Sequence, residues 1–254
     1  MSDVALLARR SVVRTLRQPA MVVPSLLFPL LLLSINSSGL ETITHLPGFP
    51  TDSYFQFALA IPFVQGALFS ANSAGTNVAS DIESGFLNRL ALTPLRRISL
   101  MLGQLMGILA LGLIQAVIFV AVGLVFGDGI AAGVGGVFVL LLLSLTISLA
   151  FGCIGAYVAL RSGNGEAVQG VFPLLFAALF LSSMSLPRNL IEIDWFRTVA
   201  DWNPVSYMLE GIRSLLITGW DGEALALGFG CAGAVAAVAM VAASSALRTR
   251  MVRT

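Results

Sequence analysis

The sequence has no lysine: all 14 of its basic side chains are arginines. A P-loop uses a lysine to reach the β- and γ-phosphates of a nucleotide, so the chain holds no such site. The single histidine, His45, and two cysteines, Cys153 and Cys231, are too few for the usual structural zinc sites. Both cysteines lie in apolar runs and read as buried side chains rather than as a disulfide. We therefore expect no catalytic residue, no metal site and no cofactor bound by this chain.

Charge is also scarce, at 11% of the 254 residues against roughly a quarter in soluble domains. Hydrophobic residues make up 57%, and the mean hydropathy is +0.93. About 20 apolar helical residues cross a bilayer. The sequence predicts an all-α, polytopic membrane protein that forms one transmembrane domain over residues 1–254. Its six expected spans are residues 20–39, 54–79, 99–126, 132–160, 167–186 and 223–247.

The arginines are distributed unevenly between the two sides that these spans define. Eleven lie in the N-terminal segment, in the loops after the second and fourth spans, and at the C-terminus, whereas only Arg188, Arg197 and Arg213 lie opposite. The positive-inside rule then places both termini in the cytoplasm. We expect a multi-pass protein of the bacterial inner (plasma) membrane. The arginines lie at the membrane face without interleaved aromatic residues, so we expect no nucleic-acid partner.

Residues 1–18 precede the first span and carry four arginines. From Val4 to Leu16 the apolar residues fall on one helical arc, with Arg10, Arg14 and Arg17 opposite. This pattern favours a helix in the membrane interface, near lipid headgroups, over a merely charged tail.

The cytoplasmic loop from Asp81 to Arg97 carries an apolar stripe. Ile82, Phe86 and Leu90 recur every four residues, as on one face of a short helix. Asp81 and Glu83 would lie in the first turn of that helix, and Thr93-Pro94 would end it. Spacing alone leaves two interpretations open, docking to a soluble partner or contact with the membrane surface.

Between the fifth and sixth spans, Asn203-Pro204 precedes a segment, Val205 to Ile217, that is too short to span. Glu210 and Arg213 are three residues apart and could pair on that helix. A re-entrant half-helix and an ordinary surface helix both fit this pattern.

Apart from Glu223, the first residue of the last span, no Asp, Glu, Lys or Arg lies within the six spans. Ion-coupled transport and voltage sensing usually need such groups, so both are disfavoured. Amide side chains either line a path or bond across helices. The candidates for path lining are Gln56, Gln65, Asn72 and Gln115.

Two motifs together resemble a known family. The first is Glu83-Ser-Gly85, followed by Leu90, Thr93-Pro94, Arg97 and Gly103-Gln104; the second is Asn203-Pro204-Val-Ser-Tyr207 with Glu210-Gly-Ile-Arg213. Together with Arg17-Gln-Pro19 and six spans, they resemble ABC-2 type transporter permeases, most closely those of the daunorubicin-resistance type. One departure is Phe86, where the family often has threonine.

This resemblance implies the membrane subunit of an ABC exporter. Two permease chains, identical or related, would pair with two cytoplasmic ATPase subunits, which would bind ATP and Mg²⁺. The ATPase-coupling residues by resemblance are Ile82, Glu83, Gly85, Phe86, Arg89, Leu90, Thr93 and Pro94. Those of the outer half-helix are Asn203, Pro204, Tyr207, Glu210 and Arg213.

Because the interior of the spans carries no fixed charge, we expect an amphipathic, drug-like or lipid-linked substrate. We also expect the chain to contact membrane lipid. Two other functions remain open. A non-transporting membrane scaffold would need no ATPase, and a passive channel should show a polar ring that this sequence lacks.

Overall fold

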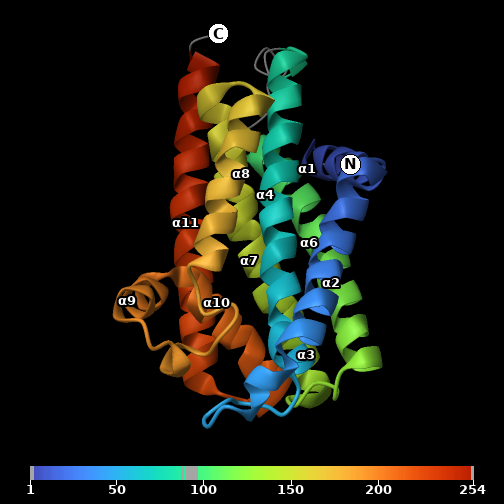
Figure 1. Cartoon of the computed structure of the whole chain (residues 1–254). Coiled ribbons are helices and arrows are strands. Elements are labelled where there is room, and N and C mark those ends of the chain that lie inside the picture. Colours follow the sequence, from blue (N-terminus) through green and yellow to red (C-terminus); the bar gives the residue numbers. More distant parts are fainter. Residues whose placement is uncertain (1–2, 87–88, 90–96, 253–254) are drawn as a thin grey trace.

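The computed structural model describes residues 3–86, 89 and 97–252, and these residues form helices and connecting loops without a strand (Figure 1). The α-helices are α1 (Asp3–Leu16), α2 (Pro19–Leu40), α3 (Tyr54–Ala58), α4 (Ala60–Glu83), α6 (Arg97–Phe126), α7 (Gly133–Ser162), α8 (Gly165–Phe180), α9 (Asp194–Trp202), α10 (Pro204–Arg213) and α11 (Gly222–Val252). Two short 3-10 helices, η1 (Glu41–His45) and η2 (Arg188–Leu190), and a π-helical turn, η3 (Ser214–Thr218), lie between them.

Within the residues that the structure describes, five helical segments are long and apolar enough to cross a membrane: Pro19–His45, Tyr54–Glu83, Gly103–Phe126, Gly133–Ser162 and Gly222–Arg250. The segment expected to span at 167–186 is the shorter helix α8, which ends at Phe180. Its 16 residues rise only about 24 Å, less than the roughly 30 Å of a hydrocarbon core. The all-α membrane architecture is confirmed, whereas the count of six crossings stays a prediction.

Local sequence explains where several helices begin. Pro19 stands at the first position of α2, where its missing N–H is harmless. Ser53 accepts a hydrogen bond from the Gln56 amide at the start of α3, and Asn164 accepts one from the Ala167 amide at the start of α8. Gly163, with φ of +86°, ends α7 in the left-handed conformation that glycine allows.

Helix α4 forms the centre of the bundle, with α2 and α8 on either side of it in Figure 1. It packs most extensively on α7, and the two backbones meet closely at Gly155 of α7. A side-chain Cβ at Gly155 would overlap the Ala71 carbonyl oxygen of α4. The close approach of these helices therefore depends on the missing side chain.

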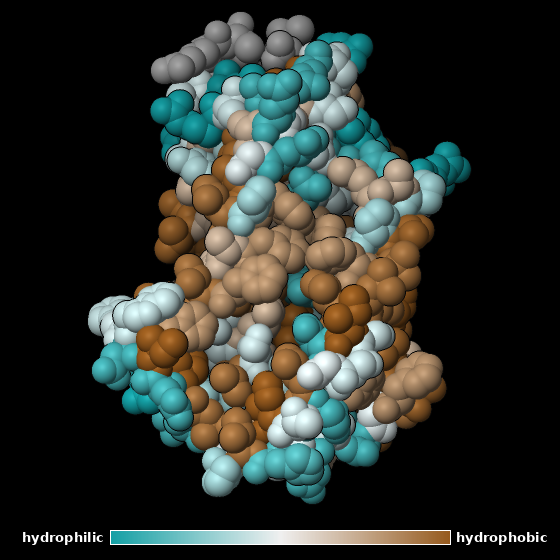
Figure 2. Space-filling model, viewed as in Figure 1, coloured by the Kyte–Doolittle hydropathy of each residue, from teal (hydrophilic) through white to brown (hydrophobic). Residues whose placement is uncertain are grey.

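The surface has the distribution of a membrane-spanning bundle. Figure 2 shows hydrophilic residues gathered at both ends and a mainly hydrophobic band between them. Large apolar side chains such as Phe126, Phe138 and Val238 are at least 70% exposed. Such a surface is stable in contact with lipid tails rather than water.

Candidate functional site

Helix α1 lies crosswise to the long helices, beside the half of the bundle in which α4 ends (Figure 1). It packs on α6 at Gly103 and Gly107, where an added Cβ would collide with Leu7 and Ser11, respectively. The helix predicted within residues 1–18 is therefore present and is held against the bundle. Its place in the membrane interface stays a prediction.

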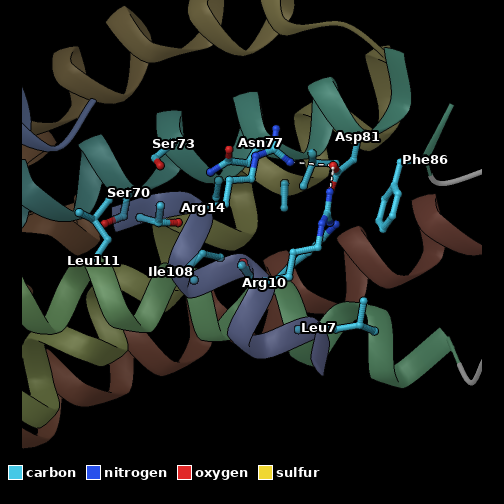
Figure 3. A pocket seen from close by; sticks show the side chains of 18 residues that line it. Leu7, Arg10, Arg14, Ser70, Ser73, Asn77, Asp81, Phe86, Ile108 and Leu111 are labelled. Carbon is cyan, nitrogen blue, oxygen red and sulfur yellow. Dashed lines mark hydrogen bonds and ion pairs between the residues drawn. The ribbon is translucent and has the colours of Figure 1, made fainter. Parts of the chain in front are cut away.

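Asp81, in the last turn of α4, joins that helix to α1. Its Oδ1 atom lies 2.9 Å from Nη2 of Arg10 and 2.7 Å from Nη1 of Arg14 (Figure 3). The Asp81 residue is only 7% exposed, so the carboxylate is largely shielded from water. Charged hydrogen bonds of this length are among the stronger polar contacts in proteins.

Phe86 is held by the same cluster. The Arg10 guanidinium carbon lies 3.8 Å from the centre of the Phe86 ring, a cation–π contact. Arg10 thus touches both Asp81 and Phe86, and it connects α1 to the segment after α4. We name Arg10, Arg14, Asp81 and Phe86 the inner junction.

The prediction that Asp81 and Glu83 begin a separate helix is wrong. Both lie in the last turn of α4, which runs on to Glu83 because nothing earlier in its sequence breaks it. Gly85, with φ of +66°, ends the helix and interrupts the expected stripe between Ile82 and Phe86.

Other predicted coupling residues have contacts within the chain. Ile82 is half-buried and packs on a small apolar cluster that includes Val78 and Leu160, so it is not presented freely to a partner. Glu83 is exposed and accepts a 3.2 Å hydrogen bond from the Gly165 amide at the start of α8. Arg89 is exposed and donates to the Ser84 carbonyl at 3.4 Å. Leu90, Thr93 and Pro94 lie outside the described residues.

At the opposite end of the bundle, Asn203 positions the segment predicted as an outer half-helix. Its Oδ1 atom accepts from the Val205 amide and caps α10, in which Pro204 is the first residue. Its Nδ2 atom donates to the Ala178 and Leu181 carbonyls, at 2.6 and 3.1 Å, where α8 ends. Asn203 therefore joins α10 to the end of α8.

The predicted pair between Glu210 and Arg213 is absent. Arg188 instead binds both carboxylate oxygens of Glu210, at 2.7 and 2.5 Å, and lies 4.4 Å from the centre of the Tyr207 ring. The spacing of three residues places Glu210 and Arg213 at neighbouring positions on α10. Arg188, from the loop before α9, binds both oxygens of the Glu210 carboxylate, and such bidentate pairs are stronger than single contacts.

Arg213 is buried beneath these residues, with 6% of its surface exposed. It donates to the carbonyls of Phe57, Ser183 and Met184, at 3.2, 2.6 and 2.6 Å, and lies 3.6 Å from the centre of the Phe57 ring. Burial lowers the pKa of the Arg213 guanidinium to about 9, and the negative charge of Glu210 opposes this shift. The side chain therefore remains a cation at neutral pH.

The four amides proposed to line a path are largely enclosed within the chain. Gln56, Gln65 and Gln115 are 4%, 1% and 2% exposed. Gln56 donates to the Gly129 and Leu216 carbonyls and so joins α3 to the loop after α6 and to η3. The Oε1 atom of Gln65, the Oδ1 atom of Asn72 and the Nε2 atom of Gln115 have no hydrogen-bond partner among the described residues. A path-lining role stays a prediction.

Residues 2–217 match the family described as ABC-2 type transporter. The chain belongs to the ABC-2 type transporter family. Among its relatives is a protein of Porphyra purpurea named "Putative transport permease ycf38", 27% identical over 86% of this chain and 76% of the relative. Proteins of the same name from Pyropia yezoensis and Cyanophora paradoxa are 27% and 25% identical over 84% of this chain and 73% of each relative.

Membership of the ABC-2 family makes this chain a membrane permease, and it implies association with an ABC ATPase. Sequence reasoning found the residues on both sides of the inner junction but not their pairing. The available signal was the four-residue spacing of Arg10 and Arg14, which places both on one face of α1. No helical spacing could predict the pairing of Arg188, because its partners Asp201 and Glu210 lie 13 and 22 residues away in the sequence.

Proposed function

We propose that this ABC-2 type chain is the permease subunit of an ATP-driven exporter. A separate cytoplasmic ATPase, in two copies, would bind ATP and Mg²⁺, and two permease chains would form the path. The absence of lysine supports this division of labour, because a P-loop in this chain would lack its phosphate-binding lysine.

The observation that carries the proposal is the inner junction. It connects three elements at one end of the bundle: α1, the end of α4, and the segment containing Phe86. An ATPase that binds the loop after Gly85 would therefore act on α1 and α4 together. Because α4 is packed along its length, its movement would alter the packing of α7 and α8.

The substrate we propose is an amphipathic molecule with an apolar body. Aromatic rings form a continuous series on α2, α4 and α8, with centroid distances of 6.0 Å for Phe28–Phe69, 5.4 Å for Phe69–Phe172 and 4.9 Å for Phe172–Phe176. Phe28 is 42% exposed, so part of this series is open at the protein surface. Such a face suits apolar cargo better than a small ion.

The test is co-purification of the permease with ABC ATPase subunits of the same cell, using wild type, Phe86→Ala and Phe126→Ala. Loss of an aromatic anchor at an interface costs about 2 kcal/mol or more. We expect Phe86→Ala to weaken docking roughly thirtyfold and to lower ATP turnover in the complex. Phe126→Ala is the matched control, since Phe126 is 74% exposed at the last residue of α6.

Equal recovery of the ATPase with wild type and Phe86→Ala, with turnover intact, would refute the coupling role. Failure of any ATPase to bind the wild-type permease would favour a scaffold. Substrate flux that needs no ATPase would favour a passive channel.

A further inference from the structure

A cavity of about 580 Å³ opens beside α10, toward the end of the bundle opposite the C-terminus. Its size lies within the range of sites for small organic ligands. Its wall carries charges of both signs, and the charged lining residues are Arg188, Arg197, Asp201, Glu210, Arg213 and Asp221.

Most of these charges already have partners. Arg188 binds Glu210 and also lies 3.4 Å from Asp201. Arg197 donates to the Ile191 carbonyl. Asp221 accepts from the Glu223 and Ala224 amides, at 3.0 and 3.1 Å, and so caps the start of α11.

Arg213 is different. No carboxylate lies within 4.0 Å of it in the part of the chain that the structure describes. A guanidinium has five N–H groups, and the three carbonyl oxygens account for one on each nitrogen. One N–H on each terminal nitrogen is left without a protein acceptor among the described residues. Buried N–H groups of a cation without an acceptor are costly, so this arrangement favours a ligand that accepts from them.

We propose that the cavity binds the head group of an amphiphile that carries an oxyanion, a phosphate or a carboxylate, with Arg213 as its donor. The free N–H groups on the two terminal nitrogens of Arg213 are donors that such an oxyanion accepts. Asp201 and Asp221 in the same wall repel further negative charge.

As a statement about the exported cargo, this inference rests on the proposed function. The binding site itself does not, because it lies in one permease chain and needs no ATPase. An experiment can therefore refute the binding site without refuting the proposed function, and the reverse.

The test measures binding to the purified full-length permease in nanodiscs of neutral lipid. Four probes share one dodecyl chain and differ only in the head: dodecyl phosphate, dodecylphosphocholine, dodecyl maltoside and dodecyltrimethylammonium. We expect the two phosphate-bearing probes to bind at a saturable site and the other two to show only partitioning into lipid. Competition by inorganic phosphate would show that the oxyanion alone is recognised. A lack of competition would show that the apolar tail is also needed. Either result supports the site if the two phosphate-bearing probes bind and the other two do not.

Two variants locate the site. Thr218 lines the cavity, so Thr218→Phe should narrow it while leaving Arg213 itself unchanged, whereas Thr218→Val keeps the volume and serves as the matched control. We expect Thr218→Phe and Arg213→Gln to weaken dodecyl phosphate binding by at least roughly tenfold, the value of one charged hydrogen bond. Because Arg213→Gln also removes bonds to three carbonyls, the Thr218 pair keeps the test valid if that variant does not fold.

Unchanged dodecyl phosphate binding by folded Thr218→Phe would overturn the inference, as would equal binding of dodecyl maltoside and dodecyl phosphate. ATP-driven transport in a permease that shows no such binding would overturn the oxyanion site and leave the proposed function standing.

Discussion

Replacing Asp81 by asparagine tests whether α1 and α4 are joined as firmly as the geometry indicates. The substitution keeps the size of the side chain and removes its charge. Arg10 and Arg14 then face each other across a site that holds no other carboxylate within 4.0 Å among the described residues. The structure allows the cost to be worked out for each arginine.

The two contacts differ in exposure. The side chains of Asp81 and Arg14 are 10% and 24% exposed, so their 2.7 Å contact is largely shielded and is worth about 1.5 to 2 kcal/mol. Arg10 is 43% exposed, and solvent screening reduces its contribution to about 0.5 kcal/mol. We expect Asp81→Asn to lower the free energy of unfolding by about 2 to 2.5 kcal/mol, less than the 3 to 5 kcal/mol of a fully buried pair.

The assay is reversible denaturation in detergent, arranged as a double-mutant cycle of Asp81→Asn with Arg14→Gln. We expect a coupling energy of about 1.5 kcal/mol. Glu83→Gln is the matched control, because Glu83 is an exposed acid in the same helical turn and the glutamine oxygen can still accept from Gly165. That variant should cost less than about 0.5 kcal/mol. Additivity of the two substitutions within about 0.3 kcal/mol would refute the junction as a stabilising unit.

Two further experiments address packing and topology. Gly155→Ala should destabilise the bundle by at least about 2 kcal/mol, because the new Cβ would meet the α4 backbone, whereas Gly233→Ala, which has no atom near the added Cβ, should be nearly neutral; equal unfolding midpoints would contradict the packing argument. In a background of Cys153→Ser and Cys231→Ser, single cysteines at Ser84 and Trp202 should be labelled from opposite sides of the membrane. Labelling of both by an impermeant reagent in intact cells would contradict the expected orientation.

The sequence was sufficient to predict the long helices, because their signal is local. Apolar runs and prolines lie in the chain itself, so α2, α6, α7 and α11 begin and end within a few residues of the expected spans. Helix α8 ended early for a tertiary reason. The Ala178 and Leu181 carbonyls beyond its middle bond to Asn203, and the Ser183 and Met184 carbonyls bond to Arg213. The donors, Asn203 and Arg213, come from a segment that hydropathy cannot place.

The candidate site was harder to predict, because helical spacing indicates which residues share one face of a helix. It does not indicate which side chains of other elements contact that face. The spacing of Glu210 and Arg213 satisfied the rule for a pair on one helix, yet both side chains found stronger partners elsewhere. The stripe of Ile82 and Phe86 was likewise interrupted by one left-handed glycine. A side-chain pair three or four residues apart on one helix contributes only about 0.2 to 0.5 kcal/mol, so tertiary contacts readily override it.

The two ends of the molecule are nevertheless connected by one continuous element. The helical segment Tyr54–Glu83, formed by α3 and α4, carries Asp81 of the inner junction near one end and Phe57 near the other. Phe57 accepts from Arg213 through its carbonyl and lies against the guanidinium through its ring, so it forms part of the wall of the large cavity. The residues between them are largely buried, which prevents the helix from bending independently of its neighbours. A tilt of α4 imposed at Asp81 would therefore be passed to α3 and to Phe57. The segment extends from the inner junction to the wall of the cavity, about 36 Å at 1.5 Å per residue.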